Sequence, residues 1–314
     1  MSIAKRIKKN INLAEFTTFK IGGRAKFFLE VKSLSDLKSA VKWAKSKSQL
    51  IFILAGGSNV LVSDKKINGL VIKLALNKLK VKGEIMFCQA GVYLSQLLKT
   101  ASQKGLSGPE WAMGIPGTVG GAIRGNAGAF GYQISQSVLK VKVYDILTNK
   151  FLILSKAQCH FTYRHSIFKE KKNLIICQIE LKFKKAAKEE IQSQLNDYKN
   201  YRYRSQPREP SAGCIFQNLT LKQLQQSQPA LAKKLETKKI VKAGKIGAGW
   251  LIEQSGLKGH RQGGAEISQK HANFIVNTGK TRAGEVIKLI NLIKKKVRKK
   301  FGVKLKEEIE YFGF

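Results

Sequence analysis

The chain has 314 residues, of which 43% are hydrophobic, and 58 lysines and arginines against 20 aspartates and glutamates give it a formal charge of +38. This much apolar material builds packed cores and excludes a disordered polyelectrolyte, and the length suits two or three domains. No run approaches the roughly 18 apolar residues of a membrane span, and no long apolar segment follows the basic first residues. We therefore expect a soluble cytoplasmic protein without a signal peptide.

The first 80 residues indicate a small βαββ arrangement. A strand at 26–32 precedes a helix at 33–48, where Ser33 is suited to be the N-cap and apolar residues recur at helical spacing. An apolar strand at 51–55 runs directly into Gly56, and a further strand follows at 70–76. The turn after 51–55 is therefore tight.

The rest of the chain alternates between β-rich and helical stretches. A strand at 85–91, a helix at 92–105 and a glycine-rich segment come first, followed by the strands 138–146, 150–154 and 174–183. The last third predicts helices at 186–206 and 248–256, a strand at 266–277, an amphipathic helix at 282–302 and a final strand at 304–314.

Two glycine segments are suited to a phosphate group. Gly56-Gly57-Ser58-Asn59 follows a strand, although a simple turn explains it equally well. The sequence GIPGTVGGAIRGNAGAFG at 114–131, called the glycine block below, has neither Rossmann nor P-loop spacing. So many glycines favour close main-chain contact with a pyrophosphate over a loop that is glycine-rich for packing alone.

The four cysteines have no metal-binding pattern. No CxxC pair is present and no histidine lies at zinc-like spacing, so we expect no metal site. Cys88 and Cys177 lie in apolar strands and are typical of reduced core thiols. Cys214 stands apart in the loop PSAGCIFQN.

The ordered motifs of the chain resemble those of the UDP-N-acetylenolpyruvoylglucosamine reductases, the MurB family. They are TTFKIGG at 17–23, LAGGSNVLVSD at 54–64, the glycine block, YRHSIF at 163–168, PSAGCIFQN at 210–218, AGWLIEQSGLKG at 248–259, GGAEISQKHANFIVN at 263–277 and FGVKLKEEIEYFG at 301–313. The resemblance covers nearly the whole chain.

The resemblance implies an α+β protein with an FAD-binding fold of the vanillyl-alcohol oxidase (PCMH) type and a C-terminal α/β substrate domain. We expect one FAD-binding subdomain at 1–79, joined by the C-terminal strand 301–314, and a second at 80–186. The substrate-binding domain is expected at 187–300. Little room remains for an extra substrate-covering loop, which suggests the shorter subtype of the family.

The implied activity is a step of peptidoglycan precursor synthesis, and thus of cell wall biogenesis, cell shape and cell division. Non-covalently bound FAD is reduced by NADPH as co-substrate and then reduces UDP-N-acetylenolpyruvoylglucosamine to UDP-N-acetylmuramate. The expected partner is this UDP-sugar, and the expected oligomeric state is a monomer.

Three residues match the catalytic residues of the family. Hydride addition to an enolpyruvyl ether pushes charge toward its carboxylate, which needs stabilisation and then a proton at the α-carbon. Arg164 in YRHS supplies a permanent cation, and Glu308 in KEEIEY matches the C-terminal glutamate, with Glu307 as the neighbouring alternative. Cys214 stands where many members carry the serine that donates the proton, and a thiol is the stronger acid.

Further positions are carried over by the resemblance as binding residues. The residues expected to bind FAD are Gly56, Gly57, Ser58, Asn59, Val60, Gly114, Gly117, Thr118, Gly120, Gly121, Asn126 and Ala127. Those expected to bind the substrate are Arg202, Gln206, Asn218, His271 and Asn273. For His271 and Asn273, a role in strand packing is nearly as well supported. Gln217 stands where lysine is common.

Two other classes of function remain as alternatives. A basic nucleic-acid-binding protein would concentrate its cations on one arm or helix, whereas the lysines here spread along the chain, so we do not expect a nucleic-acid partner. A related FAD oxidase would favour covalent flavin attachment, and no histidine-rich candidate lies near the glycine block.

Overall fold

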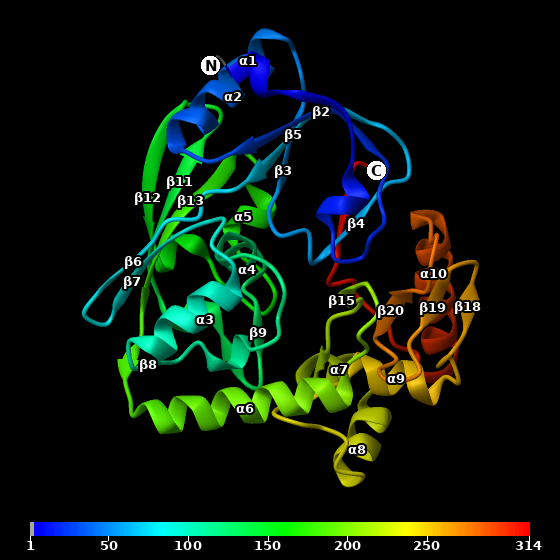
Figure 1. Ribbon diagram of the computed structural model, residues 1–314. Coiled ribbons are helices and arrows are strands. Elements are labelled where there is room, and N and C mark those ends of the chain that lie inside the picture. The colour runs from blue at the N-terminus through cyan, green and yellow to red at the C-terminus, as the bar shows by residue number, and fades with distance from the viewer. Residues whose placement is uncertain (1–2) are drawn as a thin grey trace. The chain divides into compact units, whose positions relative to one another are not determined.

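The computed structural model describes residues 3–314, which form two compact units (Figure 1). Unit 1 comprises the described residues up to Ile11, Ala25–Gly57 and Ile67–Arg204. Unit 2 comprises Asn12–Arg24, Ser58–Lys66 and Ser205–Phe314. The three domains expected from the sequence were defined by what they bind, so that division stays a prediction.

The first sheet of unit 1 is covered by a helix. Its strands, in the order β1-β2-β5-β3, are β1 (Lys8–Asn12), β2 (Arg24–Val31), β5 (Ile67–Leu74) and β3 (Ile51–Leu54). β2 and β3 each run parallel to β5. Helix α2 (Leu34–Ser46) buries its apolar stripe in the same core as β2 and β5, and Ser33 accepts a hydrogen bond from Asp36 N at 3.1 Å, which confirms the predicted N-cap.

The second sheet of unit 1 is antiparallel throughout. Its order is β12 (Lys150–Ser155), β11 (Val138–Asp145), β13 (Leu174–Lys182), β7 (Ile85–Gln89) and β6 (Leu79–Lys82). The other elements of unit 1 are α1 (Ile3–Arg6), α3 (Leu94–Gln103), β8 (Leu106–Ser107), η2 (Glu110–Ala112), α4 (Val119–Gly125), β9 (Gly128–Ala129), β10 (Tyr132–Gln133), η3 (Ile134–Gln136), η4 (Ala157–Cys159), α5 (Ile167–Glu170), β14 (Lys184–Lys185) and α6 (Lys188–Ser205).

Unit 2 is built around a separate apolar core. Its largest sheet has the order β15 (Ser211–Cys214), β20 (Phe274–Asn277), β19 (Ala265–Ile267) and β18 (Arg261–Gln262). The other elements are η1 (Leu13–Phe16), β4 (Val60–Val62), β16 (Leu219–Thr220), α7 (Leu221–Ser227), α8 (Pro229–Thr237), β17 (Lys245–Ile246), α9 (Ala248–Gln254), α10 (Ala283–Phe301) and β21 (Glu310–Phe312). β21, at the C-terminal end, pairs in parallel with β4.

The strand predicted over 266–277 is wrong in its middle. The segment is a hairpin in which β19 and β20 pair antiparallel, and a turn separates them. The Ser268 hydroxyl accepts hydrogen bonds from Lys270 N at 3.2 Å and His271 N at 3.4 Å. A serine therefore provides the turn chemistry for which glycine or proline is the usual sequence signal.

Helix α10 has an N-terminal cap that comes from elsewhere in the chain. The Asp64 carboxylate accepts hydrogen bonds from Ala283 N at 2.9 Å and Gly284 N at 3.2 Å. Capping satisfies main-chain donors that the helix itself leaves unbonded, and an acidic cap also suits the helix dipole. The cap thus attaches the segment after β4 to the longest helix of unit 2.

We expect Asp64→Ala to lower the free energy of unfolding by roughly 0.5–2 kcal/mol, the usual value of an N-cap. Denaturant titration followed by circular dichroism would measure this loss. Asp64→Asn keeps an acceptor oxygen and should retain most of the stability. An Asp64→Ala protein with an unchanged unfolding midpoint would show that the cap does not contribute.

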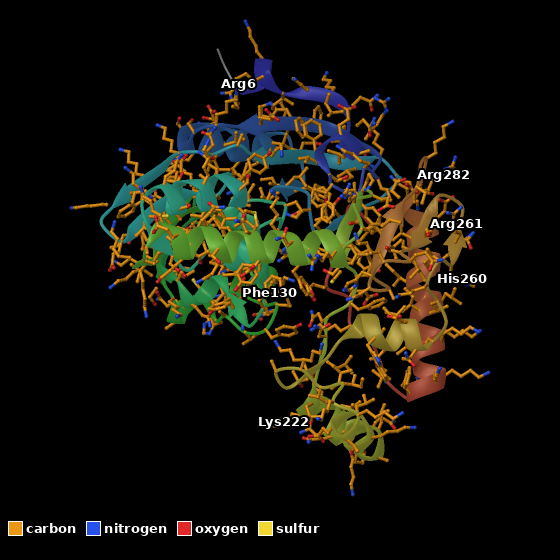
Figure 2. All side chains as sticks on the ribbon, turned by 60° about the horizontal axis from the view of Figure 1, so that its bottom comes forward. Arg6, Phe130, Lys222, His260, Arg261 and Arg282 are labelled. Atoms are coloured by element: carbon orange, nitrogen blue, oxygen red, sulfur yellow. The ribbon has the colours of Figure 1, made fainter. Side chains whose placement is uncertain are left out.

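The positive charge is spread over both units rather than confined to one helix. Figure 2 shows long nitrogen-tipped side chains projecting from elements throughout the ribbon. Within residues 3–314, no helix is long and apolar enough to cross a membrane.

Candidate active site

The two glycine segments meet in unit 1. A Cβ added to Gly56 would lie 2.7 Å from Gly117 Cα and 3.1 Å from Thr118 N. Such distances exclude any side chain at position 56, because the two backbones are in direct contact. The turn after β3 is thereby fixed against the start of the glycine block.

Close packing requires glycine at more of these positions than the sequence indicated. A Cβ on Gly120 would lie 2.7 Å from Ala90 Cβ and 2.9 Å from Ala90 O. Gly114 and Gly117 instead have positive φ angles of 74° and 116°. At Gly121 neither reason holds, since a Cβ there would meet only ordinary contacts, at 3.6 Å from Ala55 Cβ and 3.7 Å from Thr118 Oγ1.

The middle of the glycine block is a short helix, α4, which the sequence did not predict. Thr118 is its N-cap and accepts from Gly121 N at 3.4 Å. Asn126 ends the helix in the left-handed conformation, with a φ of 43°. Ala127 then continues the main-chain bonding, because its N–H donates to Ala122 O at 2.8 Å and its carbonyl accepts from Ile134 N at 2.9 Å.

Arg164 is attached to the glycine block. Its Nη2 donates to Gly128 O at 2.7 Å, and the Asn126 side chain donates to Thr162 O at 2.8 Å, in the same turn as Arg164. The Ser166 hydroxyl donates to Arg124 O at 2.6 Å. The structure therefore brings the predicted catalytic arginine to the predicted cofactor-binding segment, although they are distant in sequence.

Arg164 itself has a strained backbone. Its φ is 57°, a left-handed value that is uncommon for a residue with a long side chain. The bonds made by Asn126 and Ser166 hold the turn in this conformation. Strain of this kind persists where the surroundings over-determine the backbone, and it is frequent at active sites.

Cys214 and Glu308 are brought together in unit 2. We call residues 211–217 the Cys214 loop. Glu308 N donates to Ile215 O at 2.7 Å, and Gln217 N donates to Lys306 O at 2.9 Å, so the C-terminal segment runs antiparallel to this loop. The two predicted catalytic residues thus lie on neighbouring extended segments.

The structure also separates Glu308 from its neighbour. The Glu307 carboxylate forms an ion pair with Lys294 and accepts a hydrogen bond from the Tyr311 hydroxyl at 3.4 Å. Successive side chains of an extended segment point to opposite sides, so we expect the Glu308 carboxylate on the side opposite this ion pair. This arrangement favours Glu308 over Glu307 as the functional glutamate.

The segment Ser58–Val60 connects the Gly56 turn to Glu308. It belongs to unit 2, whereas Gly56 and Gly57 belong to unit 1. The Asn59 side chain donates to Glu308 O at 3.0 Å, Asn59 O accepts from Glu310 N at 2.9 Å, and Val60 is paired with Glu310. Asn59 therefore holds the predicted catalytic glutamate in place, whatever else it binds.

Three of the predicted substrate residues gather at the start of α9. The Asn218 side chain accepts from Ala248 N at 3.1 Å, and a Cβ on Gly249 would lie 3.1 Å from His271 Cε1. Burial lowers the pKa of His271, which keeps this imidazole neutral near pH 7. Asn273 accepts from Phe216 N at 2.9 Å and donates to Phe216 O at 2.8 Å. These bonds support the packing alternative for Asn273.

The remaining two predicted substrate residues lie at the end of α6 and just after it. Arg202 belongs to unit 1, where its Nη2 donates to Trp111 O at 3.2 Å and its guanidinium lies 5.2 Å from the centre of the Phe130 ring. Phe130 is labelled in Figure 2 and stacks on Tyr198 at 4.4 Å. Arg202 therefore packs on the glycine block, while Gln206 belongs to unit 2.

The other three cysteines are chemically inert beside Cys214. Cys88, Cys159 and Cys177 have no exposed surface, and burial raises their pKa values to about 12, 11 and 12. Cys214 is half-buried. Across residues 3–314 no group of three or more histidine, cysteine or acidic side chains could hold a metal.

Sequence reasoning missed two polar residues beside the glycine segments. Lys73 Nζ donates to Ala55 O at 3.2 Å, directly before Gly56, and burial lowers the pKa of this lysine. Glu110 is 4% exposed, and its carboxylate accepts from Gly108 N at 2.7 Å. Neither residue carries a motif, so the sequence offered no signal for them.

Comparison with known families divides the chain in two. Residues 25–148 match the FAD binding domain, and residues 206–312 match the C-terminal domain of UDP-N-acetylenolpyruvoylglucosamine reductase. Together with the mixed helices and sheets, these matches confirm the predicted α+β class with an FAD-binding domain.

Whole-chain relatives carry the same name. The UDP-N-acetylenolpyruvoylglucosamine reductase of Solibacter usitatus is 36% identical over 302 residues, which cover 96% of this chain and 95% of the relative. That of Carboxydothermus hydrogenoformans is 39% identical over 316 residues, covering 99% and 95%. The crystal structure of the Thermus caldophilus enzyme (MurB) superposes with a TM-score of 0.78 at 31% identity, covering 98% of this chain and 99% of that one. The chain therefore belongs to the UDP-N-acetylenolpyruvoylglucosamine reductase family.

Proposed function

We propose that this protein is a flavoenzyme that uses FAD and NADPH to reduce UDP-N-acetylenolpyruvoylglucosamine to UDP-N-acetylmuramate, in the cytoplasm and as a monomer. The observation that carries the proposal is the main-chain pairing of the Cys214 loop with the segment of Glu308, which places the proposed proton donor and the proposed catalytic glutamate on neighbouring segments. Family membership supports the reaction and the cofactor.

The residues of the glycine block fit a flavin cofactor. At Gly121 neither packing nor the backbone angle requires glycine, because an added Cβ would make only ordinary contacts with Ala55 and Thr118. The close approach of Gly56 to Gly117 brings two main-chain turns into contact. Main-chain donors in such turns can bind a pyrophosphate without a P-loop lysine. We assign Gly57 and Gly121 to this cradle.

The chain's own residues supply the polar steps of the reaction. Bound FAD would supply two-electron transfer from NADPH to the enolpyruvyl carbon. Charge then develops at the substrate carboxylate, and we assign its stabilisation to Arg164, whose guanidinium is already oriented by Gly128 O. The strained turn fixes the direction of this cation before the substrate binds.

Cys214 is assigned the transfer of a proton to the α-carbon of the substrate. Its loop is held on one side by Asn273 and on the other by the C-terminal segment, so the thiol has a defined position. Glu308 is assigned a hydrogen bond to the substrate oxygen on which charge develops. The neutral His271 adds no competing charge near the Cys214 loop.

The purified protein itself tests this function. Protein reconstituted with FAD should show a flavin spectrum that bleaches with NADPH and recovers with UDP-N-acetylenolpyruvoylglucosamine, and denaturation should release the flavin. A protein that cannot be reconstituted with FAD would overturn the proposal. Flavin that stays attached after denaturation would instead favour the related oxidases.

Two adjacent glycines separate packing from cofactor binding. We expect Gly120→Ala to lower the free energy of unfolding by about 1–3 kcal/mol, because the added Cβ collides with Ala90. Gly121→Ala should retain the apo stability and weaken FAD binding by at least about tenfold, measured by quenching of flavin fluorescence. Equal FAD affinity in Gly121→Ala and the unsubstituted protein would remove Gly121 from the cradle.

A further inference from the structure

The motif TTFKIGG at 17–23 belongs to unit 2, far in sequence from the residues it contacts. Phe19 and Ile21 lie in the core of unit 2 and are 0% and 2% exposed. This anchors the motif firmly, and it leaves Thr18 at the surface of the core. None of the roles assigned above uses this segment.

Thr18 bonds to the strand that carries Cys214. Its hydroxyl donates to Ser211 O at 2.8 Å, at the first residue of β15. β15 is the edge strand of its sheet, so the ladder with β20 supports it on one side only. Thr18 supplies a contact at this edge strand that the ladder does not provide.

Asn277 closes a ring of bonds around the same point. Its side chain donates to Phe19 O at 3.0 Å, and its main-chain N–H donates to Pro210 O at 2.8 Å. The Thr18–Phe19 segment is thus joined to the chain at 210–211 both directly and through Asn277. Two independent connections fix both the distance and the direction of the 210–211 backbone relative to Thr18–Phe19, which one hydrogen bond cannot do.

A second anchor lies on the other side of Cys214. Asn273 O accepts from Ile215 N at 2.8 Å, and the Asn273 side chain makes both bonds to Phe216. Only residues 212–214 lie between the two anchors. Gly213 has a φ of 77°, and the pairing with β20 is irregular between Ser211 and Cys214, so this span is bent rather than regular strand.

We propose that Thr18 is a positioning residue for Cys214: its hydrogen bond to Ser211 fixes the start of the bent span and thereby the direction of the thiol. The inference rests on the proposed function, in which Cys214 donates the proton. Without this bond, only the Asn277 bond to Pro210 and the ladder with β20 hold the start of the span, and small displacements of a catalytic group cost large factors in rate.

The test removes the hydroxyl and compares the two half-reactions. Thr18→Val should slow the recovery of the flavin by UDP-N-acetylenolpyruvoylglucosamine roughly 10- to 100-fold and leave bleaching by NADPH unchanged. Thr18→Ser should restore the rate. The control is Thr278→Val, which deletes a matching bond from a hydroxyl to Gly264 O at 2.9 Å elsewhere in unit 2. Equal recovery rates in Thr18→Val and Thr278→Val would overturn the proposal.

A double-substitution cycle shows whether Thr18 acts through Cys214. In a Cys214→Ala background, Thr18→Val should cause no further loss, because the group that it positions is absent. Additive losses from the two substitutions would contradict a positioning role.

Alkylation of Cys214 gives a readout that does not depend on the reaction. The other cysteines are fully buried, so iodoacetamide should label Cys214 alone in the folded protein. We expect Thr18→Val to change the labelling rate several-fold and Thr278→Val to leave it unchanged. If the unsubstituted protein did not reduce UDP-N-acetylenolpyruvoylglucosamine, the proposed function would be wrong. The difference in labelling rate between Thr18→Val and Thr278→Val would still decide whether Thr18 positions Cys214.

Discussion

Replacing Cys214 by alanine is expected to reduce turnover by roughly 10²- to 10⁴-fold, the range that general acid catalysis contributes. Reduction of the flavin by NADPH should proceed at its normal rate, because Cys214 is assigned only the protonation of the substrate. Stopped-flow absorbance of the flavin measures the two half-reactions separately. The defect should therefore appear only after the UDP-sugar is added.

Cys214→Ser is the matched control, since it keeps a proton donor of similar size. We expect it to retain turnover within about tenfold, because a hydroxyl is a weaker acid than a thiol. Cys214→Ser should also resist inactivation by peroxide, which oxidises accessible thiols. Normal turnover in Cys214→Ala would show that the proton comes from another group.

Replacing Glu308 by alanine is expected to reduce turnover by roughly 10²- to 10³-fold, the usual cost of removing one preorganised hydrogen-bond donor. The loss should again fall on the step with the UDP-sugar. Glu308→Gln keeps an N–H donor and should recover part of the rate. A Gln variant no better than the Ala variant would contradict the donor role.

Glu307→Ala is the control for this prediction. It removes the ion pair with Lys294 and the bond from Tyr311. We expect turnover to stay within about twofold and stability to fall by at most about 1 kcal/mol, as for other partly exposed ion pairs. A larger loss of turnover in Glu307→Ala than in Glu308→Ala would reverse the assignment of the two glutamates.

The sequence predicted the helices and strands whose apolar residues recur with a clear period. It missed turns that are formed by hydrogen bonds from nearby side chains. The helix expected at 282–302 is α10, because its apolar stripe repeats over several turns. The turn between β19 and β20 was missed, because Ser268 shapes it without glycine or proline. Short polar segments leave the pattern ambiguous, and hydrogen bonds then decide it.

The candidate site shows the same limit. Family motifs predict catalytic roles for Arg164, Cys214 and Glu308, but they do not predict the bonds that hold the segments of these residues in place. The sequence could not distinguish Gly120, which packing requires, from Gly121, which it does not. Both distinctions depend on atoms that are distant in sequence, so no local pattern records them.

Unit 2 is assembled from three separate stretches of chain, and this limits how it can be divided or exchanged. The region that matches the family's C-terminal domain, 206–312, contains neither Phe19 nor Leu61, although both are fully buried in its core. It also lacks β4, the partner of β21, and Asp64, the cap of α10. Expressed as a fragment, residues 206–312 would expose apolar surface and aggregate, so this part of the protein cannot be transplanted as a module. During synthesis, the core that buries Phe19 and Leu61 cannot form until the last third of the chain has been made. The core of unit 2 therefore assembles late and through contacts between residues that are distant in sequence.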